Sequence, residues 1–305
     1  MASDNPVLFR AVNIALLLLI AFVWASSFGA MKIAVFETGP ISLGAIRSSI
    51  GAVILLGLLR LRGPIDASLF FQNKAGLFVI AGIGTAAPFV MIPWAEQYIE
   101  SSLAGLLMAI GPIATMTGAW LFGIEEDFSA RRILGLLLGF AGAVSLLSHG
   151  FVTMGSAHLW AQIITLAASL CYVVGNLTVR RMQHLNWLVI AAGGMMMTAL
   201  LLWPLALVIE TPQPQSWSGR TWQMLLWLGV MPTAFAFAVR YFLIARAGPS
   251  FTSYVGYLIP AIAVLIGYLF LQEAVSLTKL AALALILTGL ILAQKAPAPA
   301  QKPTK

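Results

Sequence analysis

The sequence has 305 residues, of which 60% are hydrophobic and only 9% are charged. Soluble domains carry about 25% charged residues, so this composition excludes a water-soluble fold as the main architecture. The net charge of +7 is spread over single or paired basic residues between apolar runs, which argues against a nucleic-acid-binding surface. We therefore expect a chain that folds in a lipid bilayer and binds no nucleic acid.

Ten apolar runs follow one another along the chain, and each is close to the roughly 20 residues that cross a membrane. They lie near residues 11–31, 41–59, 76–95, 102–122, 133–149, 159–179, 187–208, 222–243, 251–271 and 278–294. Turn residues such as Thr38-Gly39-Pro40 separate them. The Pro/Ala/Lys segment after Lys295 is expected to be a disordered cytoplasmic tail.

The basic residues give the expected orientation of these spans. With the N-terminus inside, twelve basic residues fall in inside segments: Arg10, Arg60, Arg62, Lys74, Arg131, Arg132, Arg180, Arg181, Arg246, Lys295, Lys302 and Lys305. Only Lys32, Arg220 and Lys279 fall outside, and Lys32 is expected to end the first span as an interface anchor. Because cytoplasmic loops are rich in Lys and Arg, the sequence predicts both termini in the cytoplasm of a bacterial inner membrane protein.

The two halves of the chain match when one is shifted by 148 residues. Trp24 falls on Tyr172, Phe89 falls on Phe237, and the proline of the fourth span falls on that of the ninth. Each half holds an odd number of spans, so the second half enters the membrane in the opposite orientation. We predict an all-α membrane protein of ten transmembrane helices in two five-helix inverted repeats, residues 1–150 and 151–295, followed by the tail 296–305. Inverted repeats are characteristic of secondary transporters.

Several segments resemble the EamA-type members of the drug/metabolite transporter superfamily. Phe22–Lys32 (FVWASSFGAMK) is similar to the first helix of that family, and Arg47 to the arginine of its second helix. Tyr98–Leu147 and Arg246–Leu292 are similar to its proline-containing helices followed by an acidic turn and a Gly-rich helix. Met195 stands where Arg47 would map, so any role of Arg47 differs between the halves. The resemblance implies a transporter of amino acids, other metabolites or lipophilic compounds.

Prolines within the spans indicate where a cavity is expected. Pro112 and Pro260 occupy equivalent positions in the two halves and are predicted to be hinges or kinks. Backbone groups freed by proline must be satisfied by neighbouring protein or by water in a cavity. Paired helix breaks therefore predict a central site between the halves, although kinks set by packing alone are the alternative.

The candidate substrate-binding residues combine one deep cation with aromatic and small polar side chains. Arg47 can bind a substrate carboxylate with two parallel hydrogen bonds or tie down backbone carbonyls. Arg240 is expected to snorkel to the inner end of its span. The other candidates, each of which can instead serve helix packing, are Trp24, Ser27, Trp94, Tyr172, Asn176, Tyr254 and Tyr257.

Residue types that other functions require are missing from the span interiors. All acidic residues are expected near span ends, so no carboxylate is placed for proton coupling, and there is no phosphate-binding Gly-rich loop. We predict no catalytic residue, cofactor or metal, and a monomer is the simplest state compatible with the sequence. The leading hypothesis is a carrier that exports amino acids or related metabolites by alternating access. Export of lipophilic drug-like compounds is the second hypothesis, and a channel or an intramembrane enzyme is the least supported.

Overall fold

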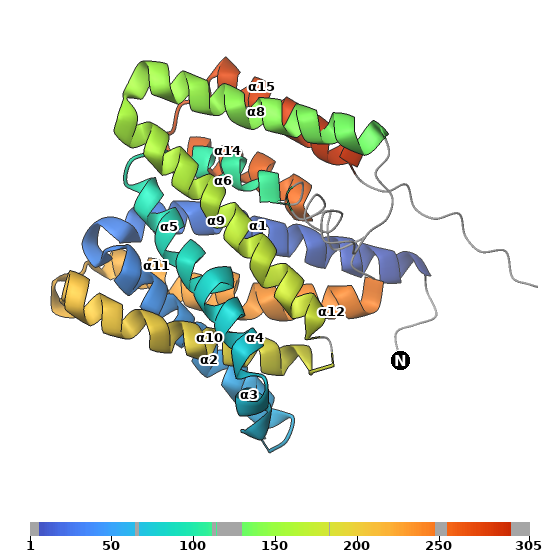
Figure 1. Cartoon of the computed structure of the whole chain (residues 1–305), viewed down its shortest axis with the longest axis vertical. Helices are drawn as coiled ribbons and strands as arrows, with labels where there is room; N and C mark the ends of the chain where they lie inside the picture. The colour runs from blue at the N-terminus through green and yellow to red at the C-terminus, as the bar shows by residue number, and fades with distance from the viewer. Residues whose placement is uncertain are drawn as a thin grey trace, which may run out of the picture.

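The computed structural model describes residues 6–64, 67–111, 114, 130–182, 184–247 and 255–293. All secondary structure in these residues is helical, which confirms the all-helical membrane fold (Figure 1). The first half contains α1 (Pro6–Thr38), α2 (Pro40–Leu61), α3 (Ser68–Gln72), α4 (Lys74–Ala81), the π-helical turn η1 (Gly82–Ala86), α5 (Ala87–Glu96), α6 (Ser101–Met108) and α8 (Ala130–Met154). The second half contains α9 (Ser156–Arg181), α10 (Trp187–Leu205), η2 (Ala206–Glu210), η3 (Pro214–Ser216), α11 (Gly219–Leu228), the π-helical turn η4 (Gly229–Phe235), α12 (Ala236–Ala247), α14 (Val255–Leu271) and α15 (Leu277–Ala293).

Six helical runs among the described residues are long and apolar enough to cross a membrane. They are Ala11–Thr38, Pro40–Leu61, Lys74–Glu96, Ser156–Val179, Trp187–Glu210 and Gly219–Arg240. Three shorter apolar helices coincide with the fifth, ninth and tenth predicted spans. About half of the fourth predicted span, including almost all of it after residue 111, lies outside the described residues. The chain therefore has about ten helices, six of which are clear spans.

The most extensive helix packing joins the two halves of the chain. Helix α8 packs against α15, α2 against α10, and α6 against α14. Figure 1 shows α8 in green lying along α15 in red. Helix α1 packs against α11, α12 and α14, and α5 packs against α9. Because each half buries its surface against the other, the region between the halves lies at the centre of the bundle.

Glycine allows two of these helices to touch through their backbones. A Cβ atom added to Gly84 in η1 would lie 2.7 Å from the Cα of Gly175 in α9. Apolar burial does not drive helices together within lipid, so small residues that permit close approach stabilise such crossings. This contact brings the third and sixth spans together beside the central cavity.

The first span is longer than the sequence predicted. Helix α1 continues to Thr38, so Lys32 lies inside the helix and the prediction that it ends the first span is wrong. Its Nζ atom donates hydrogen bonds to the backbone carbonyl oxygens of Glu96 and Ile99, the second at 2.8 Å. Both carbonyls lie at the end of the third span, where helical partners are absent, and the ammonium group satisfies them.

Candidate functional site

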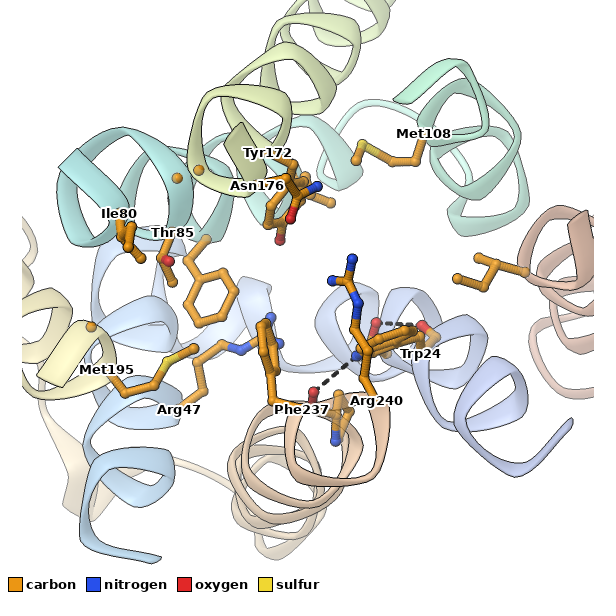
Figure 2. A pocket seen from close by; sticks show the side chains of 18 of the residues that line it. Trp24, Arg47, Ile80, Thr85, Met108, Tyr172, Asn176, Met195, Phe237 and Arg240 are labelled. Carbon is orange, nitrogen blue, oxygen red and sulfur yellow. Dashed lines mark hydrogen bonds between the residues drawn. The ribbon is translucent and has the colours of Figure 1, made fainter. Parts of the chain in front are cut away.

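A cavity of about 260 Å³ lies between helices of both halves (Figure 2). Its wall is formed by α1, α2, α4, η1, α5 and α6 of the first half and by α9, α10, η4, α12 and α14 of the second. Most of the wall is apolar or aromatic, with a few polar groups such as Ser27, Thr85 and Asn176. A mostly apolar cavity with a few convergent polar groups is typical of a small-molecule binding site.

The 148-residue repeat maps much of the cavity wall onto itself. Pairs of residues at equivalent positions both line the cavity: Trp24 and Tyr172, Ser27 and Gly175, Arg47 and Met195, Phe89 and Phe237, Ile92 and Arg240, Met108 and Gly256. The cavity therefore lies where equivalent faces of the two halves meet.

Pro232 and Thr233 explain the local shape of η4. Pro232 has no N–H group, so the carbonyl of Leu228 four residues earlier loses its usual helical partner. The hydroxyl of Thr233 donates to that carbonyl at 2.7 Å, and the segment from Gly229 to Phe235 is π-helical. The π-helical turn η1 stands at the equivalent place in the first half. Such turns interrupt regular helices and occur frequently at functional sites.

Arg47 projects from α2 into the wall of the cavity and is only 5% exposed. Its Nε and Nη2 atoms donate to the hydroxyl of Thr233 at 3.3 and 3.2 Å, and its Nη1 atom lies 3.3 Å from the sulfur of Met31. The guanidinium carbon stands 3.8 Å from the centre of the Phe89 ring. Within the described residues no carboxylate lies within ion-pair distance of Arg47, and these contacts do not occupy all five of its N–H groups.

Arg240 also lines the cavity, so the expectation that it snorkels to the inner end of its span is wrong. Figure 2 shows its side chain rising from α12 toward the middle of the cavity. Its guanidinium carbon lies 5.8 Å from the centre of the Trp24 ring, whose Nε1 atom donates to the carbonyl of Pro232 at 3.0 Å. Hydrophobic periodicity could not identify Arg240 as a cavity residue, because an arginine near a span end can either face a cavity or snorkel to the membrane surface.

Five of the candidate residues named from the sequence come together in this cavity. They are Trp24, Ser27, Arg47, Tyr172 and Asn176, and Pro260 of α14 joins them. Trp94 is absent from the wall and instead packs against Tyr98, with ring centres 4.9 Å apart and ring planes tilted by 48°. Tyr257 belongs to α14, whereas Pro112 and Tyr254 lie outside the described residues.

Four carboxylates join the two halves at the end of the bundle where α1 ends. Glu210 accepts hydrogen bonds from the backbone N–H groups of Ile41 and Ser42 at the start of α2. Glu273 accepts from Ser101 and Ser102 at the start of α6, and Glu37 accepts from Ser218 just before α11. Glu100 forms an ion pair with Lys279. We call these four interactions the latch contacts; three of them place a negative charge at the positive end of a helix dipole.

Glu273 shows how the latch contacts depend on protonation. Burial raises the pKa of the Glu273 carboxyl, but hydrogen bonds from Ser102 and Ser101 outweigh burial and leave that pKa below its ordinary value of 4.5. The carboxylate is therefore ionised at neutral pH. The pKa of Glu273 is lowered only while its latch contact is formed. The contact therefore stabilises the latched state above pH 4.5, and this stabilisation is lost as the pH falls through the lowered pKa.

Gly39 is required beside the Glu210 contact for two reasons. Its φ of 76° lies in the left-handed region, and an added Cβ would approach the Glu210 carboxyl carbon to 2.5 Å. Only glycine adopts this turn without strain or collision. The Thr38-Gly39-Pro40 connector thus holds α2 where Glu210 can cap it.

Glu96 lies at a span end, as the sequence predicted, but its environment is unusual for an acid. It is the last residue of α5, as expected for its position, but it is completely buried. Neither carboxyl oxygen has a hydrogen-bond partner within the described part of the chain. No group of three potential metal ligands occurs among those same residues, so this acid belongs to no candidate metal site.

Comparisons with known proteins agree with this architecture. The profile of the EamA-like transporter family matches residues 12–148 and again residues 158–294. The chain is 20% identical to the transporter YoaV of Bacillus subtilis (strain 168), over 90% of this chain and 93% of the relative. It is 24% identical to the inner membrane transporter YedA of Escherichia coli (strain K12), over 88% of this chain and 86% of the relative. A solved crystal structure shares the fold with a TM-score of 0.66 at 21% identity, covering 93% of this chain and 97% of that chain.

Proposed function

This chain belongs to the EamA-like transporter family, and from that membership we propose that it is a secondary carrier that exports small organic metabolites with a carboxylate group, amino acids first. The family consists of transporters rather than enzymes. The observation that carries the proposal is Arg47, a nearly buried cation in the cavity wall with no carboxylate partner among the described residues. A buried charge in a membrane protein is costly unless it is paired, so a substrate anion is its natural partner.

The surroundings of Arg47 suit the rest of an amino acid. Arginine presents a planar fork that matches a carboxylate in two parallel hydrogen bonds. The rings of Trp24 and Phe237 also line the cavity, 6.0 Å apart in an edge-to-face arrangement, and offer apolar surface for the carbon skeleton. Asn176 adds a hydrogen-bonding amide to the same cavity.

A second candidate function, export of lipophilic drug-like compounds, rests on the apolar character of the wall. Phe28, Phe89, Phe237 and several aliphatic side chains line the cavity. Apolar surface alone binds uncharged or cationic lipophilic molecules as readily as metabolites. The net positive charge of the wall favours the first candidate over lipophilic cations.

A ligand screen on the purified protein separates the two candidates. Thermal unfolding is followed with amino acids, organic acids and lipophilic cationic dyes, because a ligand that binds only the folded state raises the melting temperature. We expect stabilisation by one or more carboxylate compounds and none by the dyes. Stabilisation by the dyes alone would favour the drug-exporter function.

The membrane orientation is part of the proposal. We infer a bacterial inner membrane location with both termini cytoplasmic, on the basis of the basic residues and of a relative that is named an inner membrane transporter. Reporter fusions after Gly63 and Arg132 are expected to read cytoplasmic, and a fusion after Pro214 external. A cytoplasmic reading after Pro214 would contradict the ten-span arrangement.

In this orientation the latch contacts lie at the outer end, and residues 1–150 and 151–295 act as the two moving repeats. Alternating access requires the halves to separate at one end while they close at the other. We infer that the latch contacts hold the outer side closed and break when the carrier opens outward. This inference is supported by the fact that every latch contact joins a residue of the first half to a residue of the second.

Removing a latch carboxylate is therefore expected to favour the outward-open state. In a Cys171→Ser background, a cysteine at Ser27 reports access to the cavity from a membrane-impermeant maleimide outside the cell. Since each hydrogen bond to a charged group contributes about 1.5–3 kcal/mol, Glu210→Ala should speed labelling roughly tenfold or more. Gln213→Ala, an exposed change at the same end, is the control. Equal labelling of both variants would contradict the latch.

A further inference from the structure

Two arginines from different helices line the same cavity, and the proposed function uses only Arg47. Arg47 comes from α2 and Arg240 from α12, and they are the only charged residues in the described wall (Figure 2). Within the described residues neither guanidinium has a carboxylate at ion-pair distance. Within the described wall of the cavity, the two cationic groups thus have no carboxylate in direct contact with them.

Both arginines are linked to the eighth span. Arg47 donates to Thr233 in the π-helical turn η4, and Arg240 follows seven residues later in α12. The Arg240 guanidinium carbon lies 5.8 Å from the centre of the Trp24 ring, whose Nε1 atom donates to the carbonyl of Pro232, the residue before Thr233. Side chains of a helix lean toward its N-terminus, which is the direction of η4 from Arg240.

Both arginines break the internal repeat. The residue equivalent to Arg47 is Met195, and the residue equivalent to Arg240 is Ile92; both of these apolar residues also line the cavity. A requirement of the fold common to both halves would place similar residues at equivalent positions. Two cations with two apolar counterparts therefore indicate a role in the cavity that the common fold does not require.

We propose that the preferred substrates are small organic acids with two acidic groups, one bound by Arg47 and the other by Arg240. This inference rests on the proposed function and narrows its substrate class. The two anions neutralise both guanidinium groups, and the carbon chain between them lies against the rings of Trp24 and Phe237. A monocarboxylate leaves Arg240 without an anion.

The experiment compares substrates that differ only by replacement of one carboxylate with its amide. Countertransport of glutamate against glutamine, and of glutarate against its monoamide, is measured in proteoliposomes. The wild type is expected to transport the diacid of at least one pair roughly tenfold faster, or more, than its amide. A ratio of this size corresponds to the loss of one hydrogen bond to a charged group. Arg240→Gln should lower diacid transport by the same factor and amide transport much less, so that the preference within the pair is lost. Arg240→Lys should keep most of the preference because it keeps the charge.

Arg220→Gln is the matched control, since Arg220 is exposed at the start of α11 and is not part of the wall of the cavity. Equal transport within both pairs, or an Arg240→Gln variant that lowers acids and amides alike, would overturn the two-acid inference. Glutamine transport without a preference for glutamate would leave the proposed carboxylate carrier intact. Transport of a lipophilic cation, with neither pair carried, would instead refute the proposed function itself.

Discussion

Replacement of Arg47 by alanine is expected to lower transport of carboxylate substrates roughly ten- to hundredfold, because a lost hydrogen bond to a charged group costs about 1.5–3 kcal/mol. Arg47 is nearly buried in the cavity wall, and its contacts with Thr233, Met31 and Phe89 leave donor capacity toward the cavity. Arg47→Lys should recover only part of the transport, since an ammonium group cannot reproduce the two-pronged contact.

The measurement must separate substrate binding from folding. Initial countertransport rates are compared at equal amounts of folded protein, with Arg62→Ala as an arginine change outside the cavity wall. If Arg47→Ala lowers only the folded yield and leaves the rate per folded molecule unchanged, Arg47 has a structural role through Thr233 and the carboxylate anchor is refuted.

Substitution of Gly84 by leucine is expected to prevent normal assembly of the bundle. The first atom of any side chain there would lie 2.7 Å from the Cα of Gly175, and backbone cannot move aside as a flexible side chain can. Overpacking of a well-packed interior costs about 1–3 kcal/mol, and a backbone neighbour places this change at or above the upper end. Folded yield by size-exclusion chromatography and the melting temperature should both fall sharply.

Gly57→Leu is the matched control for Gly84→Leu. Gly57 also lies in a membrane span, but nothing stands within 4 Å of an added Cβ. The same gain in side-chain volume should therefore leave yield and melting temperature nearly unchanged. Similar losses for the two variants would show that leucine in a span, rather than the close crossing of η1 and α9, causes the effect.

The sequence predicted the spans well because membrane helices are recognisable from the length and hydropathy of their apolar runs. Predicted ends such as 187–208 and the observed run from Trp187 to Glu210 differ by two residues. The repeat likewise put Trp24 and Tyr172 at equivalent positions, and in the structure both line the cavity. Span length and repeat position are properties that one helix, or one pair of equivalent helices, carries by itself.

The errors concern contacts between helices. Arg240 and Lys32 stand near span ends in the sequence, yet one lines the cavity and the other binds the carbonyls of Glu96 and Ile99. Trp94 lies among cavity residues in sequence but turns to Tyr98. Such outcomes depend on how each helix is rotated against its neighbours. Uniformly apolar helices carry little amphipathic signal to fix that rotation from sequence.

Countertransport in proteoliposomes tests the central claim, a carboxylate-selective carrier built around Arg47, most directly. Liposomes with the purified protein are loaded with unlabelled amino acids and organic acids, and uptake of a labelled carboxylate is compared with uptake of a labelled lipophilic cation. Protein-free liposomes give the background. We predict carboxylate uptake well above background that Arg47→Ala largely abolishes, with the cation at background. Cation uptake that Arg47→Ala leaves unchanged, together with no carboxylate uptake, would contradict the claim.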